Sequence, residues 1–501
     1  MRLPESFHNW VSYAGAALAA LAFAVFVFLF VFHALSEPNR VPYAGLVIFI
    51  LVPAFILLGL ALIPVGMVVE WWRWRKTGRH SIPRFPRIDL NNPTHRNATF
   101  VFLVGSTILL FLSTYGGYRA YQYTDSVSFC GQLCHTVMKP EFVTHQNSPH
   151  ARVKCVECHV GPGATWYVRS KLSGLYQVYA TLSDTYPRPI PGTITALRPA
   201  RQVCEQCHWP QALWGGKEEP RFFFLPDQKN SRWSVDLLLK IGGTTPNTAT
   251  ARGIHWHVAH NVRVQYIATD KNRQTIPWVK VTYLPSGKSV EYAASQSPLS
   301  AEQKAAAEVR TMDCMDCHNR PSHDLLSPVE AVNLALASGA ISQQLPFIRQ
   351  EGVAVLSKQY EDLADAHSGI EKGIHDYYRK NFPDLLTSQD EQITQAIGRL
   401  REIYDEDFFP AMKSRWTDYP NHIGHWIFPG CMRCHDGQHQ SSDGKAIPHD
   451  CRNCHVILAQ GKPGEEEFRK SEEGLTFHHP VPIGGLWQQI PCTQCHSGGA
   501  D

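Results

Sequence analysis

The sequence predicts a mainly α-helical protein in which three transmembrane helices precede an irregular, loop-rich domain with short helices and a small β-hairpin insert. Three observations support this fold class. Long apolar stretches occupy the first part of the chain, all 14 cysteines follow them in one recurring motif, and two cysteine-free inserts interrupt the motifs. A chain of 501 residues is also too long for one ordinary core.

The apolar stretches cover residues 11–35, 41–69 and 98–118, and none contains Asp, Glu, Lys or Arg. Each is long enough to cross a bilayer as a helix. We interpret the first as a retained anchor, because its apolar run is longer than the core of a signal peptide. In addition, Arg2 is the only Lys or Arg ahead of it. The sequence therefore predicts a multi-pass membrane protein.

The segment between the second and third stretches, residues 70–97, is strongly basic. Its basic residues are Arg73, Arg75, Lys76, Arg79, Arg84, Arg87 and Arg96, against Glu70 and Asp89. The positive-inside rule places this loop in the cytoplasm, with Trp71, Trp72 and Trp74 at the inner interface. We interpret the charge as a topology signal, because a net charge of +3 does not indicate a nucleic-acid partner. The three helices then span a bacterial inner membrane, and the chain after Tyr118 lies in the periplasm.

The cysteines form seven pairs, and a histidine directly follows each pair. Cys-x-x-Cys-His attaches c-type haem, because the two thiols bond the porphyrin vinyl groups while the histidine ligates the iron. One copy would also suit a zinc half-site or a redox dithiol. Seven copies that use every cysteine favour seven covalently bound haems, although the first motif has three residues between its cysteines. Attachment takes place outside the cytoplasm, in agreement with the predicted topology.

The predicted attachment sites are Cys130, Cys134, Cys155, Cys158, Cys204, Cys207, Cys314, Cys317, Cys431, Cys434, Cys451, Cys454, Cys492 and Cys495. The predicted proximal iron ligands are His135, His159, His208, His318, His435, His455 and His496. The sequence thus predicts a mainly α-helical, membrane-anchored multihaem cytochrome.

Electron-transfer haems need a second axial ligand, usually histidine or methionine. The candidate distal ligands are Met138 for the first haem and His150, His257, His323, His422, His439 and His479 for the others. Two choices stay open, because His255 and His260 lie beside His257, and His425 follows His422. Each candidate also has an ordinary alternative role as a surface or core side chain.

We expect four regions along the chain. They are a membrane domain at 1–118, a haem domain at 119–210 with three motifs, a β-containing insert at 211–310, and a C-terminal haem domain at 311–501 with four motifs and a helical insert at 325–420.

Local patterns predict the structure of the two inserts. Alternation at Val262–Ala268 and Val279–Leu284, followed by a turn at 285–287, predicts a β-hairpin. Helix-type periodicity marks Pro328–Ala337, Ala354–Ala366 and Gln392–Tyr404.

The segment Ser128–Tyr179 resembles the first haem region of the NapC/NirT family of membrane-anchored quinol dehydrogenases. The shared features are a membrane helix that runs into the first motif, Met138 just after it, a Ser-x-His sequence before the second motif, and a lysine downstream. The resemblance implies that Met138 lies at the first haem, that His150 serves a later haem, and that Lys171 lies near the quinol pocket. Most of that family has one membrane helix and fewer haems, and the acidic residue expected after Lys171 is Val178 here.

The layout of three helices and seven haems is similar to the inner-membrane heptahaem cytochromes of metal-reducing bacteria. It implies that the first haem oxidises menaquinol from the membrane pool and that electrons pass along the other six to periplasmic c-type cytochromes, toward extracellular acceptors in anaerobic respiration. Quinol is confined to the bilayer, so a proton-accepting group must lie at the interface. The candidates are Lys171, Glu141 and His33.

Two other functions are compatible with many haems. A terminal reductase would bind a small oxyanion such as nitrite at an open iron, and a structural haem anchor would hold a partner reductase. The spare histidines suffice to fill every distal position, and no Cys-x-x-Cys-Lys variant marks an active-site haem. The sequence therefore favours electron transfer with quinol dehydrogenase activity over these alternatives.

Overall fold

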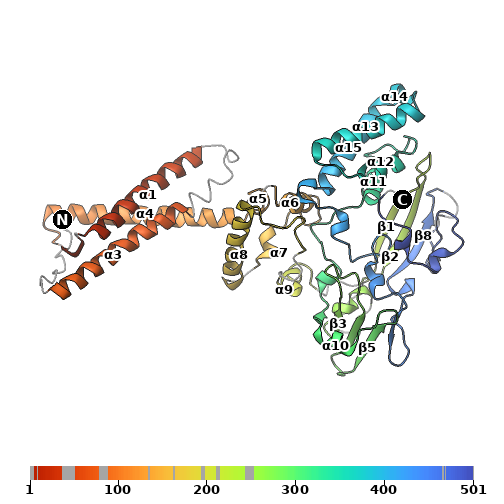
Figure 1. Cartoon of the computed structure of the whole chain (residues 1–501), viewed down its shortest axis with the longest axis horizontal. Coiled ribbons are helices and arrows are strands. Elements are labelled where there is room, and N and C mark those ends of the chain that lie inside the picture. Colours follow the sequence, from red (N-terminus) through yellow and green to blue (C-terminus); the bar gives the residue numbers. More distant parts are fainter. Residues whose placement is uncertain are drawn as a thin grey trace. The chain divides into compact units, whose positions relative to one another are not determined.

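The computed structural model describes residues 5–7, 9–35, 51–77, 89–133, 136–161, 164–192, 198–209, 215–242, 253–464, 468 and 470–499. The chain divides into two compact units, Met1–His135 and Thr136–Asp501. Figure 1 labels many of the helices and strands of each unit.

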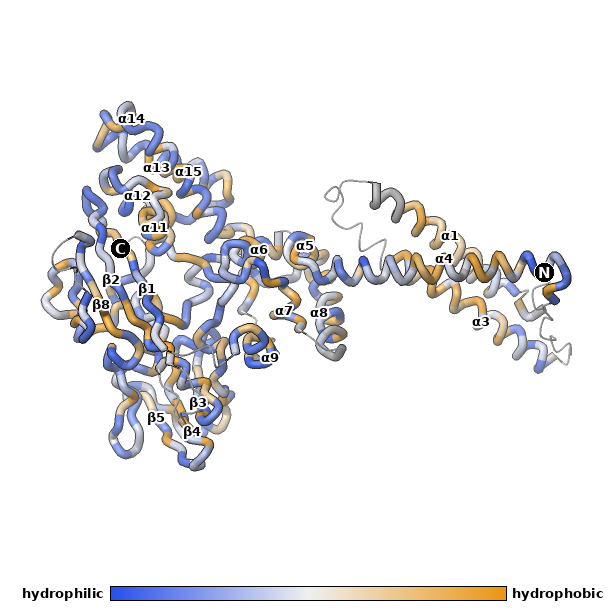
Figure 2. Tube along the Cα trace, turned by 180° about the vertical axis from the view of Figure 1, so that it is seen from behind, coloured by the Kyte–Doolittle hydropathy of each residue, from blue (hydrophilic) through white to orange (hydrophobic). Residues whose placement is uncertain are grey.

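The first unit contains three helices long and apolar enough to cross a membrane. They are α1 (Trp10–Leu35), α3 (Val52–Thr77) and α4 (Pro93–Thr124), and Figure 2 shows apolar residues along each of them. Helices α1 and α3 pack closely through glycines, since a Cβ on Gly15 would lie 2.7 Å from the carbonyl oxygen of Gly59. Small residues at such a contact are typical of helices that associate in a bilayer.

The helix ends differ from the apolar stretches in the sequence. Helix α3 continues through the tryptophans to Thr77, while residues 41–50 of the predicted second span lie outside the described residues. Helix α4 begins at Pro93, where the Asn92 side chain accepts a hydrogen bond from the Thr94 N–H. Hydropathy marks the apolar part of a span, whereas capping residues determine where the helix begins.

The second unit carries most of the cysteine motifs on short elements joined by loops. These elements are α7 (Cys155–His159), α9 (Ala200–Cys204), η5 (Cys314–Asp316), η8 (Gly430–Arg433), η9 (Cys451–Asn453) and η11 (Cys492–Gln494). Another short helix, α6 (Lys139–Gln146), lies between the first and second motifs. One longer helix, α8 (Ala164–Leu182), follows the second motif. This arrangement agrees with the predicted short helices and irregular loops.

The second unit has two antiparallel sheets, and one of them contains the hairpin that the sequence predicts. One contains β1 (Lys217–Phe224), β2 (Arg232–Leu239) and β8 (His455–Gly461) in that order. The other has the order β6 (Arg310–Thr311), β3 (Val262–Ile267), β4 (Trp278–Tyr283), β5 (Ser289–Ala294) and β7 (His439–Ser441).

The predicted hairpin is present as β3 and β4, with Val262 opposite Tyr283. The strands of the insert do not complete these sheets by themselves, however, because β7 and β8 come from the segment around the last motifs. An exposed strand edge leaves backbone groups unpaired, and these later strands satisfy part of that edge. The insert and the C-terminal haem region are therefore one folded body.

The helical insert contains α11 (Pro328–Ala337), α12 (Ile348–Leu356), α13 (Leu363–Asn381), α14 (Leu385–Ser388) and α15 (Asp390–Asp407). Its core is apolar and includes the fully buried Val332, Leu356, Ile374 and Leu400. The sequence predicts the first helix correctly and the third within α15.

The prediction of one helix across residues 354–366 is wrong. Helix α12 ends at Leu356, and α13 begins at Leu363 because the Asp362 side chain accepts a hydrogen bond from the Asp365 N–H at 2.8 Å. Such a carboxylate cap satisfies a backbone donor that a continuous helix would have paired internally.

Candidate haem-binding sites

Each motif from the second to the seventh forms a compact helical turn. In the third, fourth, fifth and seventh motifs, the backbone N–H of the histidine donates to the carbonyl of the first cysteine. The distances are 2.8 Å for His208 and His318, 2.9 Å for His496 and 3.2 Å for His435. The described cysteines are half-buried or exposed. One turn thus brings two thiols and an imidazole together. In the first motif, Cys130 lies on α5 (Val127–Gln132), and Cys134 and His135 lie outside the described residues.

Every described motif histidine faces a second histidine from another segment. The distances between ring centres are 6.2 Å for His159 and His323, 5.9 Å for His208 and His150, 6.5 Å for His318 and His255, 5.7 Å for His435 and His257, 6.2 Å for His455 and His425, and 6.0 Å for His496 and His479. Two metal–nitrogen bonds of about 2 Å, with about 1 Å from each nitrogen to its ring centre, sum to about 6 Å. The imidazoles are therefore spaced to hold one haem iron between them.

The ring orientations also suit a metal. In five of these second histidines, Nδ1 lies within hydrogen-bonding distance of a backbone carbonyl: His150 with Pro321 at 3.1 Å, His255 with Ile241 at 3.2 Å, His257 with Ile254 at 2.8 Å, His323 with Glu141 at 3.0 Å, and His479 with Val481 at 2.8 Å. A histidine whose Nδ1–H donates to a carbonyl keeps the Nε2 lone pair for a metal.

Two candidates from the sequence have a different environment. His422 has the Asp316 carbonyl at 3.0 Å from Nδ1 and the Asn272 carbonyl at 2.9 Å from Nε2. His439 contacts Asp436 through Nδ1, and its Nε2 lies 2.6 Å from the Ile276 carbonyl. Both rings have hydrogen-bond partners on both nitrogens, so the structure brings His425 rather than His422 to a motif histidine.

The histidine cluster at residues 255–260 also differs from the prediction, which expected one distal ligand from it. Both His255 and His257, on the 3-10 helix η4 (Ile254–Val258), face motif histidines, whereas the Nδ1 of His260 lies 3.1 Å from the Arg201 guanidinium. The His-x-His spacing in the sequence indicates two ligands rather than one, because alternate residues of a tight turn point to different sides.

Successive motifs lie beside one another in the order of the sequence. Helix α7 contacts α9, and α9 contacts η5, which joins the second, third and fourth motifs. Cys314 of the fourth motif lies near Cys204 of the third, and this neighbour raises the pKa of the Cys204 thiol. Burial raises the pKa of four other thiols, and in each case a cysteine of an adjacent motif raises it further. The affected thiol and its neighbour are Cys158 and Cys207, Cys317 and Cys431, Cys454 and Cys431, and Cys492 and Cys451.

Other contacts link the same neighbours. The Arg433 guanidinium in the fifth motif donates to the Asp316 carbonyl in the fourth at 3.1 Å. The Trp426 ring, next to His425, lies 5.6 Å from the ring of His496 in the seventh motif. The second to seventh motifs therefore form a continuous series.

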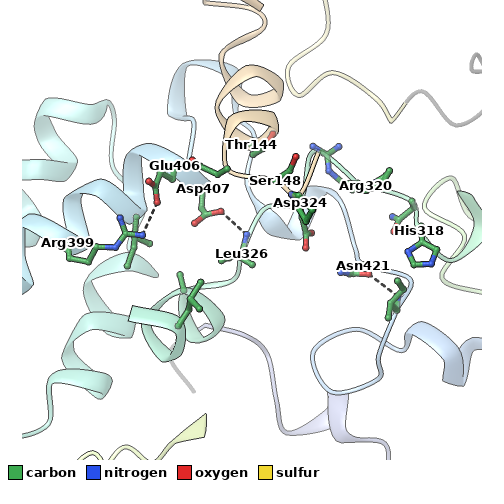
Figure 3. Close-up of a pocket in the computed structure, with 18 residues that line it drawn as sticks. Thr144, Ser148, His318, Arg320, Asp324, Leu326, Arg399, Glu406, Asp407 and Asn421 are labelled. Carbon is green, nitrogen blue, oxygen red and sulfur yellow. Dashed lines mark hydrogen bonds and ion pairs between the residues drawn. The ribbon is translucent and has the colours of Figure 1, made fainter. Parts of the chain in front are cut away.

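The side chains that line a cavity of about 570 Å³ next to the fourth motif include the charged Arg320, Asp324, Arg399 and Asp407 (Figure 3). Burial lowers the pKa of Arg320 and raises the pKa of Asp407 to about 8. The Arg320 Nη2 is buried without a hydrogen-bond partner among the described residues. A buried guanidinium with a donor to spare suits an anionic group such as a haem propionate.

The three candidates for a quinol site lie in different surroundings. Burial raises the pKa of Glu141, which the nearby Arg320 opposes, and its backbone carbonyl contacts His323. Lys171 lies on α8. His33 belongs to the last turns of α1, and its side chain lies outside the described residues. Met138 is the half-buried N-cap residue of α6.

Helix α8 has an exposed apolar stripe. Its members are between 55 % and 78 % exposed: Val168, Leu172, Leu175, Tyr176, Tyr179 and Leu182. At the angular spacing of an α-helix these residues share one face, and Arg169 and Lys171 fall at its two edges. A stripe with cationic edges is typical of a helix that lies in a membrane interface.

Residues 92–189 match a family model, the N-terminal region of the NapC/NirT cytochrome c family. The chain is also 41% identical over 497 residues to the cytochrome c-type protein ImcH of Geobacter sulfurreducens, and the match covers 98% of this chain and 96% of the relative. No solved structure matches the chain. The family match includes the first two motifs, Met138, His150 and Lys171, so it coincides with the region whose resemblance the sequence suggests.

Proposed function

Because the chain belongs to the NapC/NirT family of membrane-anchored c-type cytochromes, we propose that it is a heptahaem cytochrome that oxidises menaquinol. The oxidation takes place at the outer face of the inner membrane, and the electrons leave through periplasmic c-type cytochromes toward extracellular acceptors. Covalently bound haem c follows from the family, while seven copies follow from the seven motifs.

The observation that carries this proposal is the continuous series of motifs. Electron transfer between haems becomes slower with distance, so an efficient carrier needs neighbouring cofactors throughout. The contacts of α7 with α9 and of α9 with η5, the proximity of Cys204 to Cys314 and the Arg433–Asp316 contact support closely spaced attachment sites from the second to the fifth motif. Haems attached at these motifs would each have a neighbour to receive the electron.

Helix α8 supports quinol as the electron donor. Quinol stays in the bilayer, and the apolar stripe of α8 offers a surface that would lie in the interface next to it. Lys171 at the edge of this stripe is the group we propose for interaction with the quinol oxygen. Glu141 is buried beside Arg320, and these surroundings favour an electrostatic role near a haem over proton uptake from quinol.

The domain limits, the periplasmic location of the haem domain and the quinol and cytochrome partners belong to the same proposal. The cluster of Arg73, Arg75 and Lys76 at the end of α3 supports a cytoplasmic position for that end. A terminal reductase needs an open iron, and the second histidine opposite each described motif histidine argues against one.

The test is reduction of the detergent-solubilised holoprotein by a menaquinol analogue, followed through the haem α-band. We expect rapid reduction that slows at least tenfold in Lys171→Ala and Met138→Ala variants. Lys372→Ala, an exposed lysine on α13, is the matched control and should keep the wild-type rate. If quinol fails to reduce the wild-type protein while dithionite reduces all of its haems, the proposed quinol oxidation is wrong.

A further inference from the structure

We infer that the second to seventh haem irons are each held by two histidines, with His323, His150, His255, His257, His425 and His479 as the distal ligands in motif order. The inference rests on the haem attachment in the proposed function and does not depend on quinol oxidation. It replaces His422 and His439 among the sequence candidates by His255 and His425.

The first step is the choice between neighbouring imidazoles. His145 lies 6.3 Å from His323 in ring-centre distance, but its Nε2 lies 2.9 Å from the Val153 carbonyl and its Nδ1 lies 3.1 Å from the Gln146 amide. His323, in contrast, contacts Glu141 and Thr144 through Nδ1 alone. His323 therefore has a nitrogen to give to the iron of the second motif, and His145 does not.

The second step concerns η4, which serves two haems. His255 faces His318 with rings 12° from parallel, and His257 faces His435 with rings 84° apart. Residues two apart on a 3-10 turn point to different sides, so one turn reaches two irons. The preceding Gly253 has φ +80°, and a Cβ there would collide with the Lys240 carbonyl. The fourth and fifth haems thus share one rigid support.

The third step is the relation between ligands and motifs. His150 lies just ahead of the second motif yet faces His208 of the third, and His323 lies just after the fourth motif yet faces His159 of the second. His425 precedes the fifth motif and faces His455 of the sixth. Each of these segments holds one haem through its cysteines and another through its histidine, which fixes neighbouring haems against each other.

The test is near-infrared magnetic circular dichroism of the oxidised holoprotein, because this spectrum distinguishes His/His from His/Met ligation. We expect His257→Met to convert one haem of the seven from His/His to His/Met ligation, and His255→Met to convert a different one, so that the double variant converts two. His260→Met, in the same segment, should leave every haem unchanged. Pyridine haemochrome analysis checks that each variant still carries seven haems.

Two results would overturn the assignment: an unchanged number of His/His haems in His257→Met, or the loss of one in His260→Met. If a methionine variant fails to assemble, His257→Gly matured with added imidazole provides the same test, and recovery of one His/His haem by imidazole supports the assignment. If imidazole does not restore a His/His haem, that result contradicts the assignment. These outcomes are independent of quinol reduction, so the ligand assignment and the proposed function fail separately.

Discussion

The helical insert and the haem-binding region of the second unit are held together in different ways. Helices α11 to α15 enclose a core of apolar side chains, among them Val332 and Leu400 at 0 % exposure. The motif segments are short turns whose cysteines are half-buried or exposed, and histidines opposite them, such as His150 and His257, contact backbone carbonyls. Hydrophobic burial stabilises the first region, whereas we expect the motif segments to take many of their apolar contacts from the attached porphyrins.

The largest expected effect comes from preventing haem attachment. Protein made without cytochrome c maturation should lose the folded structure of residues 136–209 and 420–499, because the apolar surface of the haems is missing from their cores. Limited proteolysis followed by mass spectrometry should cut within these segments and leave a resistant fragment around α11 to α15. Equal cleavage of both regions would show that the insert depends on the haems too.

The next effect is a cavity in the insert. Leu400 is fully buried on α15, so Leu400→Ala should reduce the free energy of unfolding by about 2–5 kcal/mol. Leu334→Ala on α11 is the matched control, because Leu334 is 58 % exposed and should change stability by less than about 0.5 kcal/mol. Denaturant unfolding followed by far-UV circular dichroism measures both. The haem spectra of Leu400→Ala should stay as in the wild type, and a change there would contradict the separation of the two regions.

The comparison also explains what the sequence could predict. The haem attachment sites are local, since two thiols and a histidine within a few residues are enough, and the apolar spans follow from composition alone. The distal ligands are long-range. The choice of His425 over His422 depends on which ring the fold leaves with a free nitrogen, and the pairing of Ser234 with Gly461 joins strands far apart in the chain. No local pattern encodes either fact.

The interruption between helices α12 and α13 at residues 357–362 is also not predictable from hydropathy. Periodicity continues through Ala354–Ala366, and the side-chain cap from Asp362 decides where α13 begins. Capping competes with helix continuation by only about 1 kcal/mol, so hydropathy cannot resolve it. The combined β-sheets are likewise determined by tertiary packing rather than by the strands' own pattern.

The smallest expected effect is a pH dependence at the border of the two regions. Burial raises the pKa of Asp407 to about 8 in the folded protein, and its carboxylate oxygen accepts a hydrogen bond from the Leu326 N–H at 2.8 Å. The folded state then binds a proton that the unfolded state releases above its ordinary pKa, so the stability that Asp407 contributes falls as the pH rises toward 8. The slope should be about 1 kcal/mol per pH unit between pH 6 and 7.

Asp407→Asn tests this slope, because the amide oxygen keeps the acceptor for Leu326 while the titrating group is removed. We expect the variant to lose the decline in unfolding free energy between pH 6 and pH 8, measured by denaturant unfolding at each pH. Asp376→Asn on α13 is the control, since that carboxylate is exposed and should leave the wild-type slope in place. If the slope persists in Asp407→Asn, another titrating group causes it, and the assignment of the pH dependence to Asp407 is wrong.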